Sequence, residues 1–285
     1  MPLEVPNRYL ALAPVIVTAP TPRCGTTLIQ RLFGASDNAF LYGEEVGHHI
    51  RTLTNFLVGL IQQFDRTGPA NDADFERALA GTLTDWRPGL MAPSQVMLKG
   101  WVETYYQLPM ALAEFGASIR RPIWGFKGPD YPRDQLRAFL MLMPKAKVIY
   151  VFRRLDDALK SAKARRFVTD EAGVAAFCAT WAKNLSEVMA LGQDERILFV
   201  RYEELVSARA AHIQAFETFT GARGLKPEAF ETKVNTFEGD EADGRSPTQY
   251  IAPAELTDSD LAAIEAAAGP LMAELYPTPA VARSP

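Results

Sequence analysis

A loop of ten residues, 18–27, is the feature that most constrains the fold, because it separates a short apolar run from the start of a helix. Residues 13–17 have the composition of a buried strand, and apolar side chains then recur at helical spacing, at Leu28, Ile29, Leu32 and Phe33. A strand, a tight loop and a helix N-terminus together direct backbone N–H groups and a partial positive charge at one point. The sequence therefore predicts an oxyanion-binding loop in an α/β fold with a P-loop-type parallel sheet flanked by helices.

The residue types in this loop differ from those of ATP- and GTP-binding loops, since Thr26 stands where G-x-x-x-x-G-K-[ST] requires lysine. Arg23 precedes Gly25, and Thr27 follows Thr26, which places a bidentate cation, a flexible backbone and two hydroxyl donors around one anionic group. A plain strand-to-helix turn with a threonine cap explains the same residues. The loop alone leaves both interpretations open.

A second strand-like run, residues 147–152, ends in Arg153 and continues into a basic helix. In open parallel sheets the ligands lie beyond the carboxyl ends of the strands, so we expect Arg153 at the same edge as Arg23. Ser161 and Arg165 are four residues apart on that helix, so they share a face and can converge with Arg153 on a second anionic group. A solvated basic helix face is the alternative. The joint occurrence of both segments at strand ends favours one shared ligand.

Together these segments resemble the sulfotransferases that use 3′-phosphoadenosine 5′-phosphosulfate (PAPS), most closely their tyrosylprotein-type branch, over nearly the whole chain. Residues 22–28 are similar to the family's P-R-S-G-T-T-L loop, and Arg153, Ser161 and Arg165 fit its R-x7-S-x3-R element. Four further segments resemble the family's G-E-E, N-K-D-P, H-Y-E-Q-L-V and E-R-S-x-D-Q-V-I motifs, in that order: residues 42–45, 126–129, 200–206 and 244–251. The resemblance implies a PAPS-dependent sulfotransferase.

The resemblance also implies roles for individual residues. Contacts to the nucleotide are assigned to Arg23, Cys24, Gly25, Thr26, Thr27, Arg153, Ser161 and Arg165, with Tyr202 and Ser246 as additional contacts. Arg23 and Lys127 are assigned to the charge that develops at the sulfur donor. A structural role for Tyr202 or Ser246, and a solvated strand end for Lys127, are the alternatives. Cys24 replaces the family's serine, which removes one hydroxyl donor unless the backbone N–H makes that contact.

Two neighbouring glutamates, Glu44 and Glu45, are the candidates for the base that accepts the acceptor's proton. Glu45 matches the second glutamate of G-E-E and is our first assignment. Glu44 is the second candidate for the base, because the chain is one residue longer between Arg23 and Gly43 than in the tyrosylprotein enzymes. We expect the Glu45 carboxylate to lie close to Arg23. The alternative is a pair of solvated acids that open a helix running from Val46.

The implied reaction is direct: a hydroxyl or amine of a small molecule or a peptide attacks the sulfur, and adenosine 3′,5′-bisphosphate (PAP) leaves, with no metal ion. Two other function classes remain open. A P-loop kinase or related phosphotransferase would show magnesium-dependent ATP turnover, against which the absent lysine argues. A non-catalytic nucleotide-binding relative would keep Arg23 and Arg153 and be insensitive to changes at Glu44 or Glu45.

Composition limits the partners and the domain organisation. For 285 residues, 48% of them hydrophobic, we expect one domain over residues 1–285, with a helical excursion at 46–116 on the acceptor side and a fraying tail at 277–285. The net charge of −4 gives no indication of a nucleic-acid partner. Two scattered cysteines and the adjacent His48 and His49 favour neither a disulfide framework nor a metal site. With no recognisable signal peptide or membrane span, we predict a cytoplasmic enzyme.

Overall fold

The computed structural model describes residues 5–82, 86, 89–192, 194–231 and 250–277. At its centre lies a five-stranded parallel sheet with the strand order β2-β3-β1-β4-β5. The strands are β1 (Val15–Thr18), β2 (Ala39–Tyr42), β3 (Ile123–Lys127), β4 (Lys147–Phe152) and β5 (Ile197–Arg201). The predicted α/β class with a parallel sheet is therefore confirmed. The apolar runs at residues 13–17 and 147–152 overlap β1 and β4, whereas no sequence pattern predicts β2.

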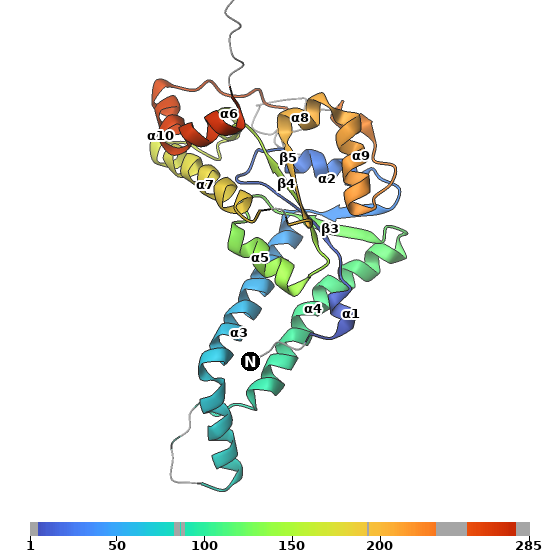
Figure 1. Ribbon diagram of the computed structural model, residues 1–285, viewed down its shortest axis with the longest axis vertical. Helices are drawn as coiled ribbons and strands as arrows, with labels where there is room; N and C mark the ends of the chain where they lie inside the picture. Colours follow the sequence, from blue (N-terminus) through green and yellow to red (C-terminus); the bar gives the residue numbers. More distant parts are fainter. Residues whose placement is uncertain (1–4, 83–85, 87–88, 193, 232–249, 278–285) are drawn as a thin grey trace, which may run out of the picture.

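Helices cover both faces of this sheet. Within the described residues they are α1 (Asn7–Leu10), α2 (Thr26–Gly34), α3 (Glu44–Leu79), α4 (Ser94–Ser118), α5 (Arg133–Leu142), α6 (Leu155–Ala164), α7 (Glu171–Met189), α8 (Tyr202–Ser207), α9 (Arg209–Thr220), the 3₁₀ helix η1 (Pro227–Phe230) and α10 (Asp258–Leu275). Figure 1 shows α6, α7 and α10 on one side of the strands, and α2 and α9 on the other. α10 begins at a capping box, in which the Thr257 hydroxyl and the Asp260 carboxylate each accept a backbone N–H of the other residue.

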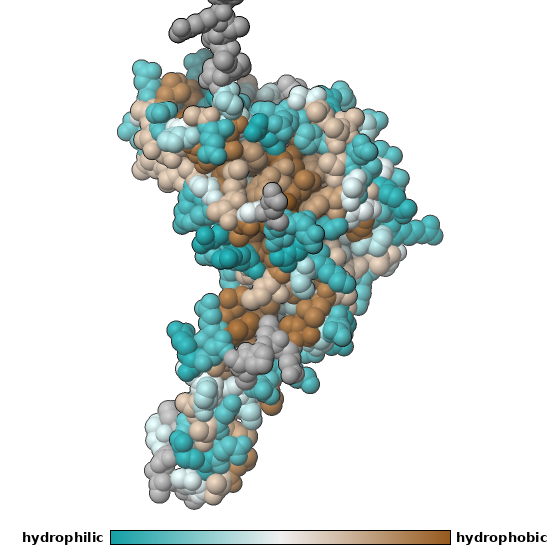
Figure 2. Space-filling view, viewed as in Figure 1, coloured by the Kyte–Doolittle hydropathy of each residue, from teal (hydrophilic) through white to brown (hydrophobic). Residues whose placement is uncertain are grey.

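An arm of two helices, α3 and α4, extends away from the sheet (Figure 1). It joins β2 to β3, where the sequence predicts a helical excursion, and its helices contact each other through buried groups such as the hydroxyls of Thr54 and Tyr105, 3.1 Å apart. α3 begins at Glu44, two residues before the expected Val46, because Gly43 is still extended and serves as its N-cap. Apolar residues reach the surface near the base of the arm (Figure 2). The acceptor-binding role of the arm stays a prediction.

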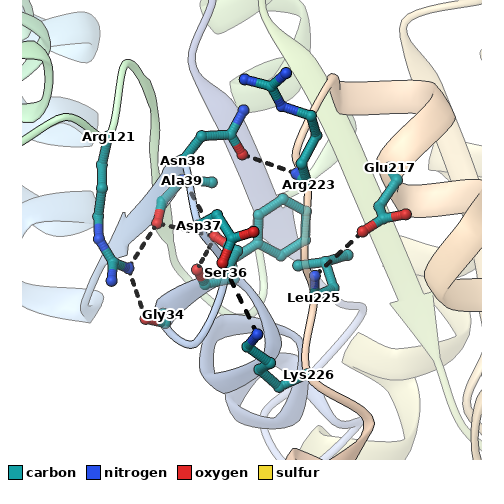
Figure 3. Close-up of polar contacts among 11 residues, drawn as sticks. Gly34, Ser36, Asp37, Asn38, Ala39, Arg121, Glu217, Arg223, Leu225 and Lys226 are labelled. Carbon is teal, nitrogen blue, oxygen red and sulfur yellow. Dashed lines mark hydrogen bonds and ion pairs between the residues drawn. The ribbon is translucent and has the colours of Figure 1, made fainter.

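The loop between α2 and β2 is held by segments that are distant in the sequence (Figure 3). Arg121 Nη1 donates to the backbone carbonyls of Gly34, at 2.7 Å, and Ala39, at 3.1 Å. From the other side, the Asn38 side-chain oxygen accepts the backbone N–H of Arg223 at 2.8 Å. These contacts hold the loop that leads into β2, which lies at one edge of the sheet. Since α3 follows β2 after one residue, they also determine where Glu44 lies.

Candidate active site

The loop between β1 and α2 has the backbone of an anion-binding turn. Arg23 and Gly25 adopt positive φ angles of 74° and 109°, and α2 starts directly afterwards at Thr26. The side chain of Cys24 is fully buried, with its Sγ 3.6 Å from the Thr21 hydroxyl. Burial also raises the pKa of the Cys24 thiol. Because this thiol faces the core, Cys24 can offer a ligand only its backbone N–H.

Gly25 is required here by both its backbone angle and its surroundings. A Cβ atom at this position would lie 2.4 Å from Cδ2 of Tyr202. We therefore expect Gly25→Ala to lower the free energy of unfolding by about 2–4 kcal/mol, since backbone strain adds to overpacking. Urea denaturation measures this loss. The control is Gly59→Ala on α3, where a new Cβ meets nothing within 4 Å, and an equal loss there would contradict the explanation.

Arginine side chains converge beside this loop. Arg23 Nε donates to the Ser161 hydroxyl on α6 at 3.2 Å, so the loop after β1 and the helix after β4 meet at one edge of the sheet. Burial, and then the nearby cations Arg165 and Arg153, lower the pKa of the Arg23 guanidinium. Cations held this close repel one another, and an anion between them removes that repulsion.

Arg153 lies near the same turn, against the tyrosine that packs on Gly25. Its guanidinium lies over the ring of Tyr202, 4.8 Å from the ring centroid. Its Nε atom is buried, and none of the described residues provides that atom with a hydrogen-bond partner. A buried N–H donor without an acceptor is costly, so Arg153 fits a ligand that brings oxygen atoms.

Lys127, at the end of β3, links the loop to the start of α3. Its side chain is only 8% exposed. The Nζ atom lies 2.9 Å from the hydroxyl of Thr27 and 2.8 Å from Oε1 of Glu44. An ammonium group, a hydroxyl and a carboxylate are thus brought together at the carboxyl edge of the sheet, next to Arg23, whose charge is also influenced by Glu44.

The two neighbouring glutamates have different surroundings. The Glu44 side chain is 54% exposed and touches Lys127, whereas the Glu45 side chain is 84% exposed and pairs with Nε2 of His49 at 3.3 Å. The sequence predicts that Glu45 lies near Arg23, whereas the carboxylate whose charge opposes the lowering of the Arg23 pKa by burial is that of Glu44. In this arrangement Glu44 faces the cationic site and Glu45 lies on the solvent side of the helix.

The sequence interpretation misses a further acidic group beside this cluster, Asp130 in the loop after β3. Asp130 has a positive φ of 64°, and its carboxylate lies 3.6 Å from Nη1 of Arg51 on α3. Burial, together with the negative charge of Glu44, raises the pKa of the Asp130 carboxyl group. Ligands of open parallel sheets lie beyond the carboxyl ends of the strands, and Asp130 comes shortly after the end of β3, so this rule could have identified Asp130.

The remaining expectations from the sequence concern residues and segments other than those of this cluster. Ser246 and the tail from residue 278 lie outside the described residues. His48 and His49 are exposed. In the described part of the chain, no group of three or more His, Cys, Asp or Glu side chains is arranged to hold a metal ion. Among the described helices, none combines the length and apolarity of a bilayer-crossing segment.

Comparison with known proteins gives a family match over most of the chain. Residues 14–225 match the model described as "Sulfotransferase family". No curated protein sequence matches. Among solved structures, the sulfotransferase domain of the Synechococcus PCC 7002 olefin synthase is 20% identical, with a TM-score of 0.50, over 89% of this chain and 94% of that one.

Two other solved structures are also similar. The sulfotransferase domain from the curacin biosynthetic pathway is 17% identical, with a TM-score of 0.49, over 90% of this chain and 97% of that one. A mouse sulfotransferase complexed with PAP is 12% identical, with a TM-score of 0.42, over 77% of this chain and 62% of that one. The structural likeness concerns the fold, whereas the family match covers more than half of the sequence. The chain belongs to the sulfotransferase family.

Proposed function

We propose that this protein transfers the sulfuryl group of PAPS to a hydroxyl or amine acceptor, with Glu44 as the general base. The observation that carries the proposal is that Lys127 contacts both Glu44 and Thr27 at the carboxyl edge of the sheet, where the turn that contains Arg23 leads into α2. Cations are needed where negative charge develops, and a carboxylate is needed where a proton is released. Membership of the sulfotransferase family supports this choice of reaction.

The residues present fit a nucleotide with two separated anionic groups. The turn at Gly25, Arg23 and Thr27 would hold the 5′-phosphosulfate, as backbone N–H groups at a helix N-terminus suit an oxyanion. Arg153 and Ser161 would hold the 3′-phosphate together with Arg165, and the unpaired Arg153 Nε is a donor for it. When bound, the nucleotide supplies the sulfuryl group and a stable leaving group.

In the proposed reaction, Glu44 acts on the acceptor's proton, whereas Lys127 and Arg23 act on the leaving oxygen. The acceptor O–H or N–H bond breaks and Glu44 takes the proton. The acceptor atom forms a bond to sulfur while the bond from sulfur to the phosphate oxygen breaks, so negative charge accumulates on that oxygen. Lys127 and Arg23 stabilise this charge by electrostatic attraction. Glu44 is preferred over Glu45 because its carboxylate is held beside Lys127.

The acceptor is proposed to be a small molecule or a peptide, and the tyrosylprotein-type branch would imply a peptide tyrosine. An acceptor screen with PAPS, read by mass spectrometry for an added sulfuryl group, tests the proposed function with peptide tyrosines, phenols, alcohols and sugars. Turnover of magnesium ATP without sulfuryl transfer would overturn the proposal. We also propose that the protein is located in the cytoplasm, because the buried Cys24 and Cys178 are both free thiols, which suits a reducing compartment.

Arg153→Ala tests the phosphate assignment. Removal of one charge-assisted contact is expected to weaken PAP binding by about 1.5–3 kcal/mol, measured by titration calorimetry. Arg209→Ala is the control, because the Arg209 guanidinium lies on an exposed part of α9 and pairs there with Glu231. We expect this substitution to leave the PAP affinity unchanged. An unchanged affinity in Arg153→Ala would reject the assignment.

A further inference from the structure

The peptide group that joins Arg153 to Arg154 is held at both ends by side chains. Its carbonyl oxygen, on Arg153, accepts a hydrogen bond from Nε1 of Trp181 at 3.1 Å. Its N–H, on Arg154, donates to Oε1 of Glu203 at 2.9 Å. Rotation of this peptide plane would break one bond or the other, so Trp181 on α7 and Glu203 on α8 together orient the backbone from which the Arg153 side chain extends.

Glu203 is in turn held by Tyr276, the residue that follows α10. The Tyr276 hydroxyl donates to the second carboxylate oxygen of Glu203, Oε2, at 3.3 Å. The Tyr276 ring lies under two guanidinium groups, 5.2 Å from that of Arg154 and 5.1 Å from that of Arg201. Burial and the charge of Glu203 raise the pKa of Tyr276, so its hydroxyl keeps its proton and remains a donor at neutral pH.

The residue before Glu203 touches the nucleotide site directly. The ring of Tyr202 packs at the open face of Gly25 in the anion-binding turn, and the Arg153 guanidinium lies over the same ring. The first turn of α8 therefore contacts Arg153 twice, through its peptide group by Glu203 and through its guanidinium by Tyr202.

We infer that Glu203 and Tyr276 are positioning residues for 3′-phosphate recognition, acting through the backbone of Arg153. The end of α10 would thereby be coupled to the affinity for the nucleotide, although Tyr276 itself does not touch the ligand. This inference rests on the proposed function, in which Arg153 binds the 3′-phosphate. It gives α10, which lies outside the motifs of the donor site, a role in nucleotide binding.

The test compares two nucleotides that differ only in the 3′-phosphate: PAP and adenosine 5′-monophosphate (AMP). Titration calorimetry gives the dissociation constant of each, and the ratio of the AMP constant to the PAP constant measures recognition of the 3′-phosphate. Tyr276→Phe keeps the ring and its cation contacts but removes the hydroxyl. We expect it to lower the ratio by about threefold to tenfold, and Glu203→Ala to lower it by about tenfold or more, as coupled neighbours do.

The matched control is Tyr105→Phe, which removes another buried tyrosine hydroxyl, bonded to Thr54 between α3 and α4. It is expected to leave the ratio unchanged even where it lowers the melting temperature. In an Arg153→Ala background, Tyr276→Phe should change the ratio no further.

A merely structural role of Tyr276 would weaken PAP and AMP equally, or neither, and that result would overturn the inference. A further drop of the ratio in the Arg153→Ala background would overturn it too, because the coupling would not pass through Arg153. A wild-type protein that binds PAP no better than AMP would instead overturn the phosphate assignment in the proposed function, and the inference with it.

Discussion

Replacing Glu44 by glutamine is expected to slow sulfuryl transfer by about 10²–10⁴-fold, the range associated with the loss of a general base. Glutamine keeps the shape of the side chain but cannot take the acceptor's proton. Since the substitution leaves the turn at Gly25 and the cluster around Arg153 untouched, binding of PAP should be retained. Single-turnover kinetics with PAPS and an active acceptor measure the rate, and calorimetry with PAP checks the binding.

Glu45→Gln is the matched control for this prediction. It changes the neighbouring residue in the same helical turn, but the Glu45 carboxylate is 84% exposed and pairs with His49 rather than with Lys127. We expect its transfer rate to stay close to that of the unaltered protein. If Glu45→Gln is slow and Glu44→Gln is not, the base is the residue that the sequence motif favours and the contact with Lys127 is not catalytic.

Replacing Lys127 by methionine is expected to lower kcat by about 10²–10³-fold, as for the loss of one group that stabilises transition-state charge. Methionine fits the site because, like lysine, it is unbranched, and because the Lys127 side chain is only 8% exposed. The ground-state affinity for PAP should fall much less than kcat, because charge on the leaving oxygen develops mainly during transfer. Steady-state kinetics and calorimetry together provide this comparison.

Lys147→Met controls for the loss of a half-buried lysine from a strand. Lys147 begins β4, at the end of the sheet opposite to the site, and its ammonium group donates to the carbonyl of Phe219. We expect this variant to affect stability and to leave kcat unaltered. An equal fall of kcat in Lys127→Met and Lys147→Met would show that lost stability, rather than lost charge stabilisation, explains the first result.

Much of the fold can be predicted from local patterns in the sequence. The apolar run at residues 147–152 coincides with β4, and the capping box of Thr257 and Asp260 that begins α10 is made by residues three positions apart. These elements are specified by side chains within a few residues of one another, so their signals are visible without knowledge of distant neighbours.

β2 could not be predicted in this way. It has four residues, and its position depends on hydrogen bonds from Arg121 and Arg223, which lie more than 80 residues away along the chain. A short strand at a sheet edge has little periodicity of its own, so long-range contacts decide both its existence and its register.

The sequence by itself determined the chemical types at the site: an arginine and a glycine in a turn before a helix, a second arginine after a strand, and a lysine at the end of another. These follow from the strand-end rule, because residues that leave a parallel sheet at one edge share a crevice. Only the tertiary structure decided which of two adjacent glutamates meets Lys127 and which side chains orient Arg153. Neighbouring residues on a helix point about 100° apart, so the rotational position of α3 about its own axis decides which of the two glutamates faces Lys127. Packing of distant elements fixes that rotation, and the order of residues along the chain does not record it.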